Sequence, residues 1–308
     1  MAAVDILAIG EAMVEFNQTG AAEGRLYLQG FGGDTSNFAV AAARQGARTG
    51  YVSALGDDVY GAMLRAMWHQ ESVDDSGVRS DVDAYTAVYF VTHDAAGHHF
   101  SFFRQGSAAS RMSAEQLPSA QIAAAQVLHC SGISMAISET ARAACFAAME
   151  TARKAGVKVS FDTNHRARLW PLALAQSTIA AAIARSDICL PSFDDLAVLT
   201  GLDAPEAMVE HCLGLGARVV ALKHGGHGAW LAEGERRIRI APHPCRPVDA
   251  TGAGDAFGGA FVARLVAGDD LEAAGRYAAA AAALSTEGYG AVAPIPHAPR
   301  VRAALGVS

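Results

Sequence analysis

A single carboxylate stands among glycines in the stretch 247–261, PVDATGAGDAFGGAF. Gly252 and Gly254 permit a tight turn with exposed backbone N–H groups, and the run that follows Asp255 is typical of a helix. Free N–H groups and the helix dipole together make such a turn a binding site for anions. A carboxylate is unexpected there, and Asp255 could cap the helix, bind a metal or act as a base.

Three further polar loops follow runs that are typical of buried strands. Lys223 ends the run VVALK before a glycine-rich turn, the loop 162–168 follows another run, and Ser192, Asp194 and Asp195 follow a third. Ligands of open α/β sheets bind outside the carboxyl ends of the strands, so these loops should converge. Three polar loops around an anion-binding turn indicate phosphoryl transfer. The turn itself is neither a Walker A loop nor a GxGxxG dinucleotide fingerprint.

The elements that must position these loops alternate between short apolar runs and helical patterns. Helices joining buried strands in this way favour an α/β fold with a mostly parallel central sheet flanked by helices. No linker-like tract divides the chain, so residues 1–308 are expected to form a single domain. The strand-like runs lie at 4–9, 51–56, 127–132, 157–162 and 219–223.

Two segments, at about 12–34 and 84–107, break this alternation and resemble inserted antiparallel strands. Together they could form a small antiparallel β lid. In the second segment Phe102 and Arg104 share one face of a strand, because side chains alternate between faces. This pair could be a platform for an anionic ligand. Alternatively, Phe102 and Phe103 pack the lid and Arg104 extends into solvent.

Composition excludes several classes of function. The chain is 51% apolar and 18% charged, with a net charge of −7, which argues against disorder and against broad nucleic-acid binding. Five scattered cysteines without metal-ligand spacing suggest reduced thiols in a cytoplasmic protein. No apolar run is long enough to span a bilayer, so no membrane partner is expected.

The motifs GGDTSN, at 32–37, and DATGAGDAF, at 249–257, resemble the two signatures of the PfkB (ribokinase-like) carbohydrate kinases. The resemblance covers nearly the whole chain. GEAMVEF, HCSGISMAIS and FDTNHRARLW are most similar to 2-keto-3-deoxygluconate kinases. The resemblance implies a ribokinase-like fold and Mg²⁺-dependent transfer of the ATP γ-phosphoryl group to 2-keto-3-deoxy-D-gluconate, giving 2-keto-3-deoxy-6-phosphogluconate.

The resemblance also implies roles for individual residues. Asp255 would be the base, with the backbone of Gly252, Ala253 and Gly254 forming an anion hole for the phosphoryl group. Asp195 would serve Mg²⁺ through water. The substrate would meet Gly33, Asp34, Asn37, Tyr89, Phe102, Arg104, Arg166 and Asp255; the nucleotide would meet Asn164, Ser192, Lys223, Gly225, Gly228, Thr251, Gly252 and Gly254.

Physical chemistry adds two expectations. A helix N-terminus favours an ionised carboxylate, so Asp255 should have a low pKa and accept its proton late in a loose transition state. Arginines favour a substrate that carries a carboxylate, because the guanidinium fork binds it bidentately. A neutral hexose would not require them.

Two departures from the family pattern leave alternatives open. Phe102 and Phe103 stand where the lid strand usually carries tyrosines, and 192–195 reads Ser-Phe-Asp-Asp where the family has Asn-x-x-Glu. The acids at 194–195 could equally complement a helix dipole. The alternatives are a fructokinase, a ribokinase or a related sugar-acid kinase, or a sugar- or nucleotide-binding sensor without catalysis. Lid strands suggest a homo-oligomer, and activation by K⁺ near 249–251 stays open.

Overall fold

The computed structural model describes residues 4–20, 24–94 and 97–307. Within them the chain forms a nine-stranded sheet, in which neighbours from β5 to β11 are parallel and β12 and β13 are antiparallel additions at one edge. The prediction of a mostly parallel central sheet is confirmed. In spatial order the strands are β5 (Val73–Asp81), β4 (Thr49–Gly56), β1 (Ile6–Ile9), β8 (Val127–Ser131), β9 (Lys158–Asp162), β10 (Ile188–Cys189), β11 (Val219–Lys223), β12 (Ala229–Glu233) and β13 (Arg236–Ile240).

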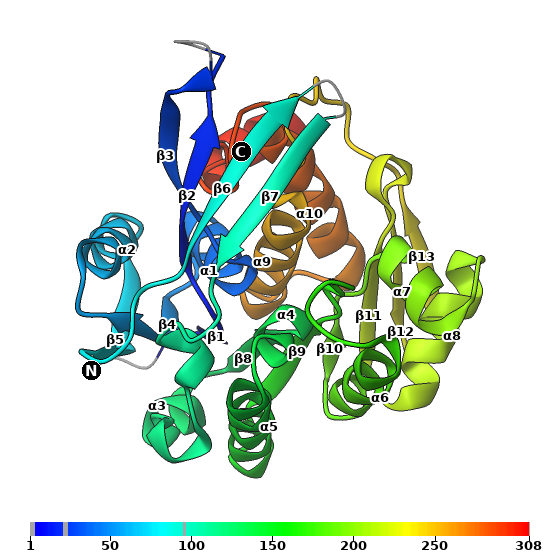
Figure 1. Ribbon diagram of the computed structural model, residues 1–308. Coiled ribbons are helices and arrows are strands. Elements are labelled where there is room, and N and C mark those ends of the chain that lie inside the picture. Colours follow the sequence, from blue (N-terminus) through cyan, green and yellow to red (C-terminus); the bar gives the residue numbers. More distant parts are fainter. Residues whose placement is uncertain (1–3, 21–23, 95–96, 308) are drawn as a thin grey trace.

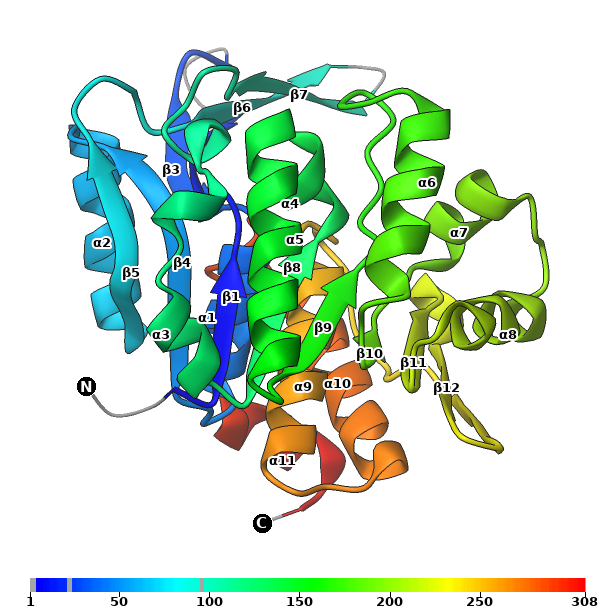
Figure 2. The same ribbon diagram turned by 90° about the horizontal axis from the view of Figure 1, so that it is seen from below.

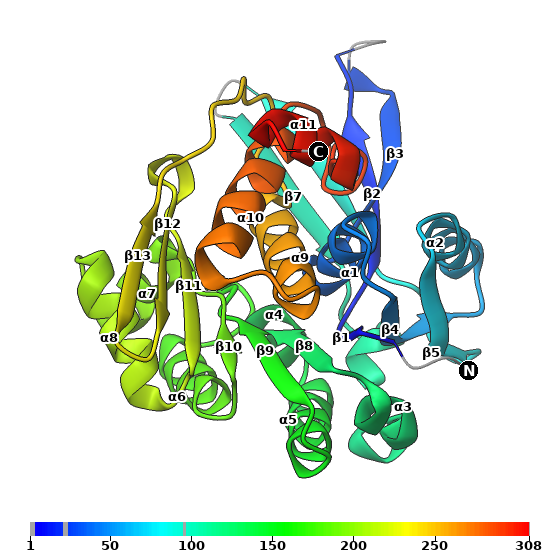
Figure 3. The ribbon, with the colours of Figure 1, turned by 180° about the vertical axis from the view of Figure 1, so that it is seen from behind.

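Helices cover the two faces of this sheet (Figures 2 and 3). Side chains of β1 alternate between the two cores, Ile6 and Ala8 to one and Leu7 and Ile9 to the other, as a strand buried on both faces requires. The first core includes α1 (Asp34–Arg44), α2 (Val59–Gln70), α9 (Ala253–Val266), α10 (Leu271–Ser285) and α11 (Ala298–Leu305). The second includes α3 (Ser119–Ala124), α4 (Gly132–Ala136), α5 (Glu139–Lys154), α6 (Leu172–Ile183), α7 (Phe193–Thr200) and α8 (Pro205–Leu215).

A second, four-stranded sheet forms the lid and lies across one end of the body (Figures 1 and 2). Its order is β3 (Tyr27–Gly32), β2 (Met13–Gln18), β6 (Val88–Asp94) and β7 (Gly97–Phe103). Both predicted hairpins are present and antiparallel, although residues 21–23 and 95–96 of the predicted lid segments lie outside the described part. The hairpins are joined by a parallel pair, β2 with β6, which the sequence did not predict.

Two further expectations can be compared with the structure. All five cysteines are free thiols, and four of them are buried. In the described ranges no helix has the length and apolar character needed to cross a membrane.

Candidate active site

The start of α9 is shaped by Gly252. This residue has a φ of 75°, and a Cβ on it would lie 2.9 Å from the carbonyl oxygen of Ala291. Only glycine therefore fits, both conformationally and sterically. The N–H of Ala253 donates to the carbonyl of Ala250 at 3.2 Å, whereas the N–H groups of Gly254 and Asp255 have no acceptor among the described residues. These two N–H groups at a helix start can bind an anion.

Asp255, in the first turn of α9, has a pKa raised from 3.8 to about 8. Burial is the largest cause, followed by the like charge of Asp34; Asp162 adds to it, while Asn37 and Lys223 act in the opposite direction. The prediction of a low pKa is therefore wrong. A helix dipole contributes roughly 0.3–1 kcal/mol, whereas removing a carboxylate from water costs several kcal/mol. A base with a pKa near neutrality is well matched to proton transfer.

Helix α1 brings two predicted residues to the same place. The side-chain amide of Asn37 donates to Asp255 Oδ2 at 2.8 Å. Asp34 Oδ2 accepts a hydrogen bond of 3.0 Å from the amide of Asn164, so the start of α1 is tied to the loop after β9. Gly33 precedes this helix with a φ of 106°, and a Cβ there would lie 2.3 Å from a backbone oxygen. The close approach of this segment to the backbone of Glu11 therefore requires glycine at position 33.

Lys223, at the end of β11, lies beside the start of α9. Its Nζ pairs with the buried carboxylate of Asp162 at the end of β9, and a Cβ on Gly254 would lie 3.5 Å from the same Nζ. Burial raises the pKa of Asp162, and the charge of Lys223 opposes that shift. The cation is thus held next to the free N–H groups of Gly254 and Asp255, where it can add to an anion site.

The loop after β9 separates its polar residues into two environments. Asn164 and His165 are buried, and Asn164 has a positive φ of 30°. Arg166 is exposed and donates to the carbonyl of His165 at 2.9 Å. No carboxylate pairs with Arg166 in the described part of the chain. Of the predicted arginines, Arg166 is the one whose charge is available to a ligand.

Ser192 and Asp195 form the start of α7. The Ser192 hydroxyl accepts from the backbone N–H of Asp195 at 3.2 Å as an N-cap, and Asp195 Oδ2 accepts from the Thr163 hydroxyl at 3.0 Å. This arrangement matches the helix-start alternative. Across the described ranges, no three His, Cys, Asp or Glu residues gather as a metal site.

The turn between β11 and β12 has an exposed, glycine-rich surface. Gly225 is exposed and Gly228 is half-buried with a φ of 89°. The neighbouring His224 ring stacks on Phe193, with centroids 4.2 Å apart. Thr251, in the loop before α9, is fixed by two hydrogen bonds to Asp249, of 2.9 Å from its N–H and 2.6 Å from its hydroxyl. These loops leave polar backbone accessible beside Lys223.

The lid presents Tyr89, Phe102 and Arg104 together. The rings of Tyr89 and Phe102 stack with centroids 5.5 Å apart, and the guanidinium of Arg104 lies 5.6 Å from the Phe102 centroid. Phe102 and Arg104 therefore lie on the same side of the lid, as the alternation of side chains predicted. Arg104 does not extend into solvent: its side chain is 11% exposed and forms an ion pair with the fully buried Glu11. The Tyr89 hydroxyl donates to Glu15.

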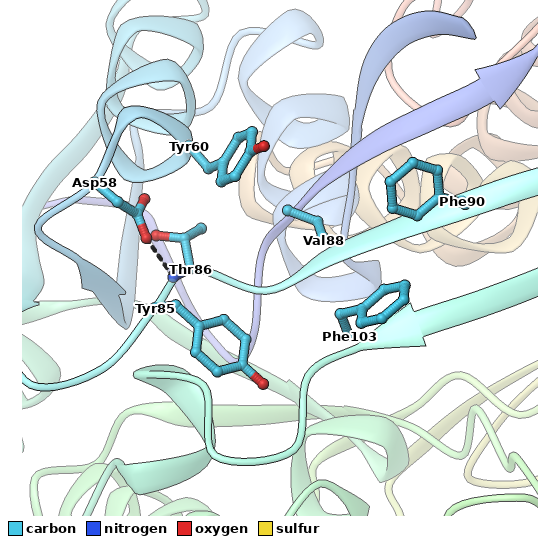
Figure 4. Close-up of a pocket in the computed structure, with 7 residues that line it drawn as sticks. All are labelled: Asp58, Tyr60, Tyr85, Thr86, Val88, Phe90 and Phe103. Atoms are coloured by element: carbon cyan, nitrogen blue, oxygen red, sulfur yellow. Dashed lines mark hydrogen bonds between the residues drawn. The ribbon is translucent and has the colours of Figure 1, made fainter.

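A hollow of about 390 Å³ lies on a different part of the lid (Figure 4). Its walls are mainly aromatic and aliphatic, and its one carboxylate, on Asp58, accepts a hydrogen bond of 2.7 Å from the backbone of Thr86. Its strand residues alternate with Tyr89 and Phe102, so the hollow opens on the opposite face of the lid sheet. The lining residues are Asp58, Tyr60, Tyr85, Thr86, Val88, Phe90 and Phe103.

Glu11, Glu15 and Asp162 were not assigned roles from the sequence. Each is a buried acid in or close to a strand: Glu11 lies two residues after β1, Glu15 lies within β2 and Asp162 is the last residue of β9. Buried acids are rare unless they are paired. A carboxylate in or beside an otherwise apolar strand segment was therefore the sequence signal that could have identified these residues.

Comparisons with known proteins agree with this arrangement. The model of the pfkB family carbohydrate kinases matches residues 4–298. Fructokinase-1 of Oryza sativa subsp. japonica is 34% identical over 94% of this chain and 94% of its own, and the 2-dehydro-3-deoxygluconokinase of Thermoproteus tenax is 32% identical over 92% and 88%. The structure of fructokinase with bound ATP from Xylella fastidiosa superposes with a TM-score of 0.90, at 26% identity over 98% of each chain.

The family match spans nearly all of the chain, including the start of α9, Lys223 and the lid strands. The fold is accordingly ribokinase-like, with a large, mostly parallel sheet and a small lid sheet. The chain belongs to the pfkB family of carbohydrate kinases.

Proposed function

We propose that this protein transfers the γ-phosphoryl group of ATP to the primary hydroxyl of 2-keto-3-deoxy-D-gluconate. The observation that carries the kinase reaction is the start of α9. There the free N–H groups of Gly254 and Asp255, the cation of Lys223 and a carboxylate with a pKa near 8 lie together. This combination suits a negatively charged group next to an alcohol.

In the proposed reaction the sugar oxygen forms a bond to the γ-phosphorus, the bond from that phosphorus to the β–γ bridging oxygen breaks, and ADP leaves. The hydroxyl proton passes to the carboxylate of Asp255. Because its pKa is raised, Asp255 holds that proton more strongly than an ordinary aspartate would. Asn37 orients the carboxylate through its 2.8 Å hydrogen bond. The N–H groups and Lys223 stabilise the charge on the transferring group.

ATP is expected to arrive with Mg²⁺, which proteins commonly bind through one or two carboxylates together with phosphates and water. Asp195 fits this role: its carboxylate is half-buried and has one described side-chain partner, the Thr163 hydroxyl. The metal would neutralise phosphate charge when bound. Asn164 and the glycine-rich turn with Gly225 and Gly228 would contact the nucleotide.

The choice of a sugar acid rests on Arg166. Its exposed guanidinium has no carboxylate partner in the described chain, whereas Arg104 is already paired with Glu11. A substrate carboxylate would give Arg166 the partner it lacks, in a charge-assisted hydrogen bond. The resemblance of the loop 161–170 to 2-keto-3-deoxygluconate kinases and the relative from Thermoproteus tenax support the same choice.

Fructose phosphorylation is the second candidate. It is favoured by the 34% identity to the rice fructokinase and by the pairing of Arg104 with Glu11, which leaves the lid contact without net charge. A neutral sugar would then rely on hydrogen bonds to acids such as Asp34 and Asp255 rather than on cations.

A coupled assay of ADP release with 2-keto-3-deoxygluconate, fructose, ribose and gluconate tests the proposal. We expect fastest turnover of 2-keto-3-deoxygluconate, and Arg166→Gln should lower its kcat/KM by about 10- to 100-fold, the value of a charge-assisted hydrogen bond. Arg168→Gln, at an exposed arginine in the same loop, is the matched control and should have little effect. Rapid turnover of fructose alone would refute the acid substrate.

We also propose that the protein forms homo-oligomers through the lid. Strands β3 and β7 are the edges of the lid sheet, and Leu28 and Phe103 on them are 61% and 56% exposed. Unpaired strand edges with apolar side chains favour association. Light scattering coupled to size-exclusion chromatography would detect the oligomer, and a monomer at all concentrations would contradict the proposal.

Activation by K⁺ bound near residues 249–251 is a separate proposal. Adding K⁺ at constant ionic strength in the ADP-release assay tests whether K⁺ raises the turnover rate.

A further inference from the structure

Glu11 and Arg104 join two of the chain segments that connect the body to the lid. Glu11 lies between the end of β1 and the start of β2, and Arg104 directly follows β7. The Glu11 side chain is 0% exposed and that of Arg104 is 11% exposed, so water screens their ion pair little. The positive charge beneath the lid is therefore cancelled by a neighbour 93 positions away (104 − 11).

Glu11 is held in place independently of Arg104. Its Oε1 accepts a hydrogen bond of 2.8 Å from the Ser107 hydroxyl, and its carbonyl oxygen lies against Gly33, which has no room for a Cβ. The Glu11 carboxylate and backbone therefore both have contacts besides Arg104. Burial raises the pKa of the Glu11 carboxyl, and the charge of Arg104 and the hydrogen bond from Ser107 oppose that shift, so the ion pair favours the ionised form of Glu11.

Arg104 nevertheless keeps hydrogen-bonding capacity. Its Nε and Nη2 are buried and have no well-directed hydrogen bond in the described structure, nor does Glu11 Oε2, although the two charged groups are in contact. The guanidinium lies over Phe102, which stacks on Tyr89 at the inner face of the lid. A substrate oxygen that reached the partly exposed guanidinium would receive a hydrogen bond from it, and no net charge would be added to the pocket.

We propose that Glu11 sets how strongly this enzyme distinguishes a sugar acid from a neutral sugar, by cancelling the charge of Arg104 while keeping its guanidinium in place. This inference rests on the proposed function in so far as the substrate is a sugar. Glu11 is a positioning residue, since it acts through Arg104. The paired arginine donates hydrogen bonds to oxygen atoms of either class of sugar, and discrimination between the classes is left to cations elsewhere in the site, such as Arg166.

The test is the ratio of kcat/KM for 2-keto-3-deoxygluconate to that for fructose. Glu11→Gln keeps the size of the side chain and an acceptor for Ser107 but leaves Arg104 charged. We expect the ratio to rise at least tenfold, mainly through a lower KM for the acid. Glu11→Asp, which retains the charge, should stay within threefold of the wild type. The matched control is Glu71→Gln, which removes the acid from the partly buried ion pair of Glu71 with Arg44. Its ratio should also stay within threefold of the wild-type ratio.

An unchanged ratio in folded Glu11→Gln overturns the inference. If that variant does not fold, the double variant Glu11→Gln/Arg104→Gln, which leaves no charge in this pair, decides. It should keep the wild-type ratio within threefold, because Glu11 already cancels the charge that is removed. A tenfold lower ratio would show that Arg104 acts as an uncompensated cation. If the wild-type enzyme phosphorylates only fructose, the proposed substrate is refuted but the inference about Glu11 is not. In that case the inference requires that Glu11→Gln gain turnover of 2-keto-3-deoxygluconate.

Discussion

Asp255→Asn should stabilise the protein while it abolishes turnover, and the gain in stability should depend on pH. In the folded protein the pKa of Asp255 is about 8, whereas in the unfolded chain it is near 3.8. Between these values the folded state binds more protons than the unfolded state, so the contribution of Asp255 to stability falls as pH rises and levels off above about pH 8. Asparagine carries no charge and removes this dependence.

The size of the effect follows from the pKa shift. Roughly four pH units at about 1.4 kcal/mol each set a ceiling near 6 kcal/mol. Asp255 is half-buried by surface area, so solvent screening lowers the expected gain to roughly 1–3 kcal/mol. At about 2 °C per kcal/mol for a chain of this size, the melting temperature should rise by about 2–6 °C. Asparagine can still accept the hydrogen bond of Asn37.

The assay is thermal melting of both proteins from pH 5 to pH 9, because the difference between them cancels the other titrating groups. The difference should be small at pH 5 and largest at pH 9. Asp57→Asn, at an exposed acid, is the control and should give a flat difference. A difference for Asp255→Asn that does not change with pH, or a variant less stable than the wild type at pH 9, would refute the reasoning.

Lys223→Met should leave the carboxylate of Asp162 buried without its cation, lowering unfolding free energy by about 3–5 kcal/mol; denaturant melts would show this, and a loss below 1 kcal/mol would contradict it. The same variant should weaken ATP binding measured by calorimetry, whereas unchanged affinity would remove Lys223 from the nucleotide site. Asn37→Ala removes a hydrogen bond that lowers the pKa of Asp255, so the rising limb of the pH–rate profile should move to higher pH. A limb that stays in place or moves to lower pH would contradict that role.

Much of the body could be predicted from local sequence, because its strands are apolar runs and its loops are marked by glycines and polar residues. β5 could not, because its sequence VDDSGVRSD is largely polar and sits at a sheet edge. The pairing of Arg104 with Glu11 and the raised pKa of Asp255 depend on residues far apart in the chain. A helix start favours an ionised acid locally, but burial and the charges of Asp34 and Asp162 come from other elements.

The parallel pair of β2 and β6 has a consequence for how the molecule comes apart. Val14 pairs with Val88, 74 positions away (88 − 14), so closing this pair costs more chain entropy than forming a local hairpin does, and we expect it to form late. Its own buried cluster is small, comprising Met13, Ala87, Tyr89 and Val91. Such a unit can open while the large cores stay intact. A sugar bound between lid and body would hold it shut, and the rate at which a protease cuts the lid would report how much of the enzyme is loaded.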